Sequence, residues 1–268
     1  MFGFSVLMSV YIKETADNLH DSLESIVSNT FPPSEIVIVF DGPVSNEVEK
    51  LVNDYSKRYV IKIIRLSTNM GLGNALNAGL RHCAYEWVFR MDSDDICVNN
   101  RFELQIKEII KDDELDIIGG VIQEFNSDMK NSIGFRYVPL DNESIHIKCK
   151  TRCPFNHMTV GFKKEKILKV GGYLHHEMME DYNLWVRLLS DNIKAKNIND
   201  VLVNVRAGDS MISRRRGVRY SVSEFKLAKL KIYHGLQSHI CAYAVFIGRA
   251  SLRLLPVTIL KSVYKKLR

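Results

Sequence analysis

The stretch from Trp87 to Asp95 (WVFRMDSDD) joins a short apolar run to three carboxylates. The apolar part predicts a buried strand, and in open α/β sheets ligands bind beyond the carboxyl ends of such strands. Residues two apart in an extended chain point to the same side, so Asp92 and Asp94 can face one ligand together. Two neighbouring carboxylates favour a cation between them, and oxygen ligands suit Mg2+ or Mn2+ carrying substrate phosphates. The alternative is an acidic turn in which Ser93 and Asp95 cap the next helix.

A second aspartate, Asp41, follows the apolar run 35–40 and precedes Gly42 and Pro43. An aspartate after an early strand commonly accepts hydrogen bonds from a nucleotide's sugar or base, although Asp-Gly-Pro is also an ordinary turn sequence. The glycines of the stretch 69–79 (NMGLGNALNAG) could let a helix N-terminus approach a phosphate. That pattern matches neither the GxGxxG nor the P-loop motif, so alone it is weak.

Two later stretches also carry charged groups suited to chemistry. Glu180 and Asp181 begin a predicted helix, where the helix dipole by itself favours carboxylates. The run 213–217 (SRRRG) is a compact cationic loop that is either a clamp for a diphosphate or a solvated charge run.

The elements that must position these residues alternate regularly through the first 125 residues. Apolar runs predict strands over 5–11, 35–40, 60–66, 87–92 and 116–125, and helical spacing predicts helices over 15–29, 48–55, 71–82 and 102–110. Repeated βα units of this length predict an α/β fold with a doubly wound, mostly parallel sheet. Beyond residue 125 we expect a strand near 160, helices over 164–170 and 180–189, a strand over 201–206, and a helical remainder.

Size and cysteine content narrow the class of protein. A chain of 268 residues can bury a sizeable core as one domain or one and a half. Its five cysteines show no paired CxxC spacing, which disfavours a zinc site and favours free thiols in a reducing cytoplasm. The chain starts in an apolar strand without a basic leader, so we expect no secretion signal.

The net charge of +6 is distributed unevenly. From Arg214 onward the chain carries thirteen basic residues and one acid, about +12, which leaves about −6 for the rest. The tail is helical and amphipathic, and its apolar run 240–248 is too short to span a bilayer. The tail is therefore either an interfacial helix on an anionic membrane or an ordinary helical subdomain. We discount nucleic acid as a partner because no binding motif accompanies the charge.

Taken in order, these stretches resemble family 2 glycosyltransferases, which have the GT-A fold. The resemblance rests on the strands 5–11 and 36–42, the pattern N-x-G-x-G over 69–79, the DxD motif at 92–94, the ED motif at 180–187 (EDYNLWVR), and Arg206 with the loop 211–217. It covers residues 4 to 217 and implies an inverting transfer of a sugar from a nucleotide-activated donor. The resemblance assigns the family's roles to matching residues. Asp41, Asn69, Gly71 and Asp92 would bind the nucleoside, and Asp94, beside Asp92, would bind the cation. Asp181 would be the base with Glu180 beside it, and Arg214 and Arg215 would bind the diphosphate.

The resemblance also implies a domain organisation and a setting. Residues 1–220 would form the GT-A domain, with a nucleotide-sugar half (1–125) and an acceptor half (126–220), and residues 221–268 the basic tail. The setting would be bacterial O-antigen or capsule synthesis at the inner face of the cytoplasmic membrane. The donor would be a UDP-hexose, glucose first, the acceptor a sugar on polyprenyl diphosphate, and the cofactor Mn2+ or Mg2+.

Three alternatives remain at this stage. A nucleotidyltransferase normally needs a glycine-rich, basic loop after its first strand, and the loop 12–17 (IKETAD) has no glycine. A non-catalytic, membrane-docked scaffold would not need both the DxD and the ED carboxylates. A hydrolase would require water in place of the acceptor.

Overall fold

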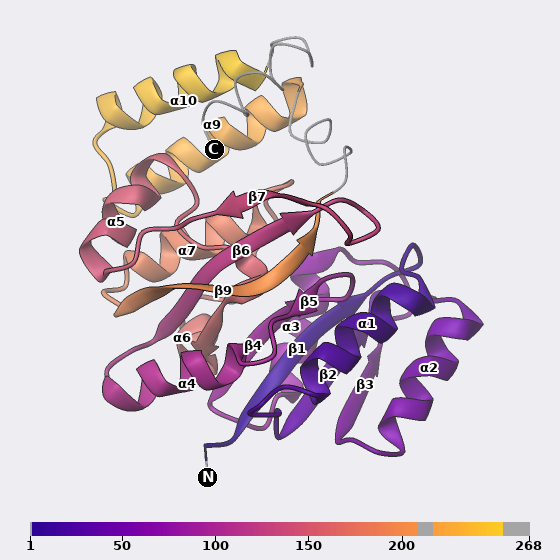
Figure 1. Cartoon of the computed structure of the whole chain (residues 1–268). Helices are drawn as coiled ribbons and strands as arrows, with labels where there is room; N and C mark the ends of the chain where they lie inside the picture. The colour runs from indigo at the N-terminus through magenta and orange to yellow at the C-terminus, as the bar shows by residue number, and fades with distance from the viewer. Residues whose placement is uncertain (1, 208–216, 254–268) are drawn as a thin grey trace.

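A computed structural model describes residues 2–207 and 217–253, which form one nine-stranded sheet with helices on both faces (Figure 1). The strand order is β3-β2-β1-β4-β8-β6-β9-β5, with β7 paired to β6. The strands are β1 (Phe4–Val10), β2 (Glu35–Phe40), β3 (Ile61–Arg65), β4 (Trp87–Asp92), β5 (Ile96–Cys97), β6 (Ile117–Phe125), β7 (Ser132–Arg136), β8 (Gly161–Lys163) and β9 (Ala195–Arg206).

Most of the sheet is parallel. β3, β2, β1 and β4 pair in parallel, as do β6 and β9. The short β8 is antiparallel to both β4 and β6, so β6 runs in the same direction as β4. The carboxyl ends of β1, β2, β4, β6 and β9 therefore meet at one edge of the sheet, as the arrowheads in Figure 1 show. This confirms the predicted α/β, mostly parallel architecture.

The two faces of the sheet carry separate apolar clusters because side chains alternate along each strand. Met8 and Phe89 pack with α1 (Ala16–Val27), α2 (Asn46–Ser56) and α4 (Arg101–Lys111). Leu7 and Val88 pack on the other face with α3 (Leu72–His82), α5 (Asn142–Thr151), α6 (Lys164–Lys169) and α7 (Glu180–Leu189). α7, which starts with the ED motif, and the carboxyl end of β4 thus share one side of the sheet.

Most predicted elements are present, and the differences have local causes. β2 covers the predicted range 35–40, whereas β9 starts at Ala195, six residues before the predicted strand. The sequence did not predict β5, β7 or α5. β5 is only two residues long, β7 is largely exposed, and α5 buries only Ile145 and Cys149, so none carries a strong hydrophobic period.

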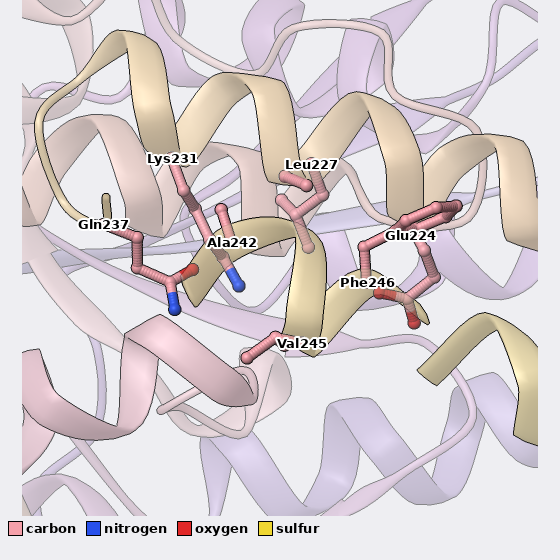
Figure 2. Close-up of a pocket in the computed structure, with 8 residues that line it drawn as sticks. Glu224, Leu227, Lys231, Gln237, Ala242, Val245 and Phe246 are labelled. Carbon is pink, nitrogen blue, oxygen red and sulfur yellow. The ribbon is translucent and has the colours of Figure 1, made fainter. Parts of the chain in front are cut away.

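Up to residue 253, the carboxyl-terminal part of the chain forms two packed helices, α9 (Val218–Tyr233) and α10 (His239–Arg253), and α9 also contacts α7. Between the two lies a small pocket lined by Leu227, Lys231, Gln237 and Phe246, among others (Figure 2). Glu224 of α9 is buried and forms an ion pair with Arg249 of α10 at 2.7 Å. None of the helices in the described ranges is long and apolar enough to cross a bilayer.

Lys231 ties α9 to the rest of the fold. Its ammonium is buried and donates to the carbonyl oxygen of Lys150 and to the hydroxyl of Tyr182, both at 2.8 Å. Strands from both sides of residue 125 belong to the same sheet. The proposed domain boundaries at 125 and 220 stay predictions.

The burial of Lys231 predicts a pH-dependent stability. Desolvation lowers the pKa of its amine to about 8, from the ordinary 10.5. Between these values the unfolded chain binds more protons than the folded one, so the stability of the wild type relative to Lys231→Met rises with pH. At about 1.4 kcal/mol per pKa unit we expect a rise of about 2 kcal/mol from roughly pH 7 to pH 10, measured by urea unfolding. If the difference in unfolding free energy between wild type and Lys231→Met does not change with pH, the lowered pKa of Lys231 is contradicted. Lys229→Met, at an exposed site on the same helix, is the control.

Candidate active site

The DxD loop at the end of β4 is held from beneath and from one side. The carboxylate of Asp92 pairs with the guanidinium of Arg90, and its backbone oxygen accepts from the hydroxyl of Ser22 at 3.0 Å. The hydroxyl of Ser93 donates to the carboxylate of Glu14, which is buried in the loop after β1. The alternative in which Ser93 caps the next helix is therefore not supported, because its hydroxyl contacts the loop after β1 and not the following helix.

The carboxyl end of β9 braces the same loop. The backbone N–H of Arg206 donates to Oδ1 of Asp95 at 3.0 Å, and its Nε donates to the backbone oxygen of Asp94 at 2.8 Å. The guanidinium also pairs with Asp21 of α1 at 2.7 Å. The strand that leads into the arginine-rich loop is thereby fixed to the DxD motif.

Negative charge accumulates at this loop. Asp94 keeps contact with solvent, yet partial burial, with repulsion from Asp92 and Glu14, raises the pKa of its carboxyl to about 6. Burial, followed by repulsion from Asp92 and Asp94, raises the pKa of Asp95 well above its ordinary value. A cation at Asp94 would relieve this repulsion, whereas a simple acidic turn would not need to hold the carboxylates so close.

Asp41 lies at the carboxyl end of β2 and organises the loop before α3. Its two carboxylate oxygens accept the backbone N–H groups of Met70 at 2.6 Å and Gly71 at 3.0 Å, and Asn69 donates to its backbone oxygen at 3.3 Å. Gly42 has φ of +85°, and a Cβ there would lie 2.7 Å from the backbone nitrogen of Asn69. Asp41, Asn69 and Gly71 therefore come together, and the buried carboxylate of Asp41 holds the loop before α3 in place.

The start of α3 also touches the segment that precedes α7. A Cβ at Gly73 would lie 3.3 Å from Cβ of Tyr173 and 3.6 Å from Cγ of Glu180. Asn77 donates to the backbone oxygen of Tyr173 at 2.7 Å and accepts its N–H at 2.8 Å. The glycine pattern thus brings the two halves of the site into contact.

The two ED carboxylates differ in their surroundings. Oδ1 of Asp181 accepts the N–H of Tyr182 at 2.7 Å, and its Oδ2 lies 3.8 Å from the thiol of Cys153. Burial, and then the charge of Asp181, raises the pKa of Glu180. Asp181 is half-buried, and within the described residues its Oδ2 accepts only the long, weak hydrogen bond of the Cys153 thiol, so Oδ2 is the less firmly held oxygen and the one that suits a base.

Side chains later in α7 fix this helix in place. The guanidinium of Arg187 donates to the backbone oxygens of Gly172 at 2.6 Å and of Val170. Asn183 contacts Nδ1 of the buried His176, whose Nε2 contacts the backbone oxygen of Ser223 in α9 at 2.9 Å. The arginine of the ED motif therefore supports the segment before the carboxylates.

The structure adds residues that the sequence did not single out. Glu14 joins the carboxylates of the DxD loop, and Arg90 pairs with Asp92. His157 contacts the hydroxyl of Tyr173 at 2.8 Å beneath the site. Arg90 could have been found from one signal, because it is a charged residue inside an apolar strand two positions before Asp92. Glu14 and His157 carried none, because their partners are distant in the chain.

One part of the predicted site lies outside the described residues. Arg214 and Arg215, expected to close over the diphosphate, belong to the range 208–216. Their roles stay predictions.

The donor set fits a divalent cation that is shared with a substrate. In the described ranges no group of three or more His, Cys, Asp or Glu side chains is arranged to hold a metal ion. Asp94, with Asp92 beside it, supplies hard oxygen ligands, and Mg2+ is commonly bound by one or two carboxylates together with substrate phosphates. A cation site completed by a diphosphate therefore matches the residues present.

Comparison with known proteins gives a consistent result. Residues 5–167 match the family described as "Glycosyl transferase family 2". The chain is 41% identical to the amylovoran biosynthesis glycosyltransferase AmsE of Erwinia amylovora, over 98% of both chains. It is 38% identical to an Escherichia coli protein named UDP-Gal:alpha-D-GlcNAc-diphosphoundecaprenol beta-1,3-galactosyltransferase, over 98% of this chain and 95% of that one.

Solved structures support the fold. The S. aureus TarS fragment 1–349 in complex with UDP-GlcNAc has a TM-score of 0.68 at 19% identity, covering 92% of this chain and 72% of that one. The mannosyltransferase PcManGT of Pyrobaculum calidifontis, in complex with GDP-Man and Mn2+, has a TM-score of 0.61 at 15% identity, covering 98% and 79%. The fold is therefore GT-A, as expected.

The contact between Asn77 and Tyr173 can be tested directly. Asn77→Ala removes two hydrogen bonds that join α3 to the segment before α7, so we expect a loss of about 2 kcal/mol in the free energy of unfolding. Asn74→Ala, at an exposed site on the same helix, should change it by less than about 0.5 kcal/mol. Urea unfolding of both variants checks this, and equal losses would show that the bridge to Tyr173 adds nothing.

Proposed function

The chain belongs to glycosyl transferase family 2, and from this premise we propose that it transfers a hexosyl group from a UDP-sugar to a hydroxyl of a lipid-diphosphate-linked sugar, with inversion. The product would be part of a bacterial surface polysaccharide. The similarity to the E. coli galactosyltransferase supports galactose as the donor sugar and a lipid-linked GlcNAc as the acceptor. Glucose, our first expectation, stays a prediction to be compared with galactose.

One observation carries this proposal. The glycine motif at the start of α3 meets the segment that carries the ED carboxylates, through the contacts of Gly73 with Glu180 and of Asn77 with Tyr173. A transferase needs a diphosphate site and a base within reach of one reacting carbon, and these contacts support such an arrangement.

On the donor side, Asp41, Asn69 and Gly71 would hold the uridine, and Asp92 would accept a ribose hydroxyl. Asp94, beside Asp92, would hold Mn2+ or Mg2+ against the diphosphate. When bound, such a cation would neutralise the charge that develops on the leaving diphosphate. Arg214 and Arg215 would add to that neutralisation.

On the acceptor side, Asp181 would take the proton of the attacking hydroxyl through Oδ2, since Oδ1 is fixed by the N–H of Tyr182. The acceptor oxygen forms a bond to the anomeric carbon while the bond from that carbon to the diphosphate oxygen breaks, and UDP leaves with the electron pair. One displacement from the opposite face inverts the centre and needs no covalent nucleophile. Glu180 would shape the acceptor pocket.

The geometry disfavours the alternatives. A nucleotidyltransferase would place a triphosphate near the loop after β1, where the buried carboxylate of Glu14 would repel it. A non-catalytic scaffold would not need Asp181 to be oriented by Tyr182.

A lipid-linked acceptor would bring the enzyme to the inner face of the cytoplasmic membrane, and α10 supports such peripheral contact. Ile240 and Ile247 are 85% and 61% exposed, and Ala244 and Ser251 lie on the same exposed stripe. Exposed basic residues of α9 suit an anionic lipid surface.

Donor binding provides the central test. Calorimetric titration should show UDP binding that requires Mn2+ or Mg2+, with GDP and CDP binding at least about tenfold more weakly. Asp94→Asn should abolish the metal-dependent part, whereas Asp113→Asn, an exposed carboxylate after α4, should leave it unchanged. Failure of every nucleoside diphosphate to bind would refute the proposal.

The base is tested separately from binding. Asp181→Asn is expected to bind UDP as the wild type does, because the amide keeps a carbonyl oxygen for the N–H of Tyr182. Transfer from UDP-galactose or UDP-glucose to a lipid-linked N-acetylglucosamine should fall by about a hundredfold or more, since general base catalysis contributes about that much. Normal turnover by this variant would exclude Asp181 as the base.

Membrane contact is tested with vesicles. The double substitution Ile240→Asp and Ile247→Asp should lower sedimentation with phosphatidylglycerol vesicles at least tenfold, because each buried isoleucine contributes about 1.5–3 kcal/mol. Ile110→Asp, 68% exposed on α4 near the opposite end of the molecule in Figure 1, is the matched control. Unchanged sedimentation of the double variant would leave α10 with a structural role only.

A further inference from the structure

Arg90 occupies a position in β4 where a charge is costly. Val88, Arg90 and Asp92 alternate onto the face of the sheet that α3 and α7 cover. The side chain of Arg90 is 2% exposed, and its guanidinium interacts electrostatically with Tyr173 and His157. A strand that needed only a core residue here would carry an apolar one, as it does at Val88.

The guanidinium is also under-used as a hydrogen-bond donor. Arginine has five N–H donors, and within the described chain Nε and Nη1 of Arg90 have no hydrogen-bond partner. Among the described residues, the salt bridge of this side chain is the one between its Nη2 and Asp92. Because a buried cation with unmet donors destabilises a fold, its value must lie in what it does to Asp92.

The pairing makes the two aspartates of the DxD motif unequal. Arg90 engages Oδ1 of Asp92 from within the sheet, while the side chain of Asp92 stays 28% exposed. A carboxylate whose charge an arginine already compensates is a poor ligand for a second cation, because that cation would lie close to the guanidinium. It remains a good acceptor for a neutral hydroxyl, through its other oxygen.

We propose that Arg90 is a positioning residue that fixes Asp92 as the acceptor for a ribose hydroxyl and leaves Asp94 as the cation ligand. This rests on the proposed function, in which Asp92 faces the nucleoside. The contact between Arg90 and Asp92 thus divides the DxD motif into a sugar-reading carboxylate and a metal-binding one.

The experiment compares two ligands on the full-length protein with Mn2+ present: UDP and 2′,3′-dideoxy-UDP, which lacks the ribose hydroxyls. We expect the wild type to bind UDP at least about tenfold more tightly, because a hydrogen bond to a charged group discriminates by that factor or more. Arg90→Met should weaken UDP binding about tenfold and leave dideoxy-UDP binding nearly unchanged. The ratio of the two affinities, which we call the ligand preference, then falls towards one. Arg90→Lys, which keeps a charge beneath Asp92, should retain part of the preference.

Two further variants separate positioning from general support of the fold. Arg101→Met removes another fully buried arginine, which contacts the backbone oxygen of Arg90 and the sulfurs of Met91 and Cys97. It should lower stability without changing the ligand preference. In an Asp92→Asn background, adding Arg90→Met should not lower the ratio of UDP affinity to dideoxy-UDP affinity any further, because the effects of residues that act as a pair are not additive.

The outcomes are distinct. If Arg90→Met weakens both ligands equally, or keeps the wild-type preference, the proposal is overturned and Arg90 supports only the fold. If Arg90→Met does not fold, Arg90→Lys provides the test. The guanidinium is not needed if Arg90→Lys prefers UDP over dideoxy-UDP as strongly as the wild type does, while Asp92→Asn binds the two ligands equally. A wild type that binds neither ligand refutes the proposed function itself, a result separate from all of these.

Discussion

Repulsion between carboxylates is the constraint on which the site depends. Glu14, Asp92, Asp94 and Asp95 meet at the end of β4, and the pKa values of Asp94 and Asp95 are raised by burial and by this repulsion. The fold tolerates the cluster because Arg90 pairs with Asp92 and the backbone N–H of Arg206 binds Asp95. In the proposed function, the remaining negative charge would attract a cation and, through it, a diphosphate.

The same edge shows why a mostly parallel sheet suits this chemistry. The parallel strands deliver Asp41 and Asp92 to the same edge of the sheet, on either side of β1, and α7 brings Glu180 and Asp181 from the face that α3 covers. Asn77 then joins the two sets through Tyr173. Stable packing and catalytic geometry therefore depend on some of the same contacts.

The sequence predicted the fold better than the site's supports. Alternating apolar runs located β1 to β4, β6 and the main helices, because burial imposes a period on the chain. The candidate ligands Asp41, Asp92, Asp94 and Asp181 were visible since they follow strands or start a helix. Glu14 and Tyr173 were not, because their roles arise from contacts between residues far apart in the sequence, and no local period marks such contacts.

The buried amine of Lys231 has a consequence for how such enzymes change over time. Its bonds to Tyr182 and to the backbone of Lys150 make α9 part of the scaffold beside the ED motif. α9 is thus an integral part of the folded domain. Exchange of α9 for another segment would leave Tyr182 without the ammonium that it accepts from, so changes in α7 and α9 are expected to be coupled.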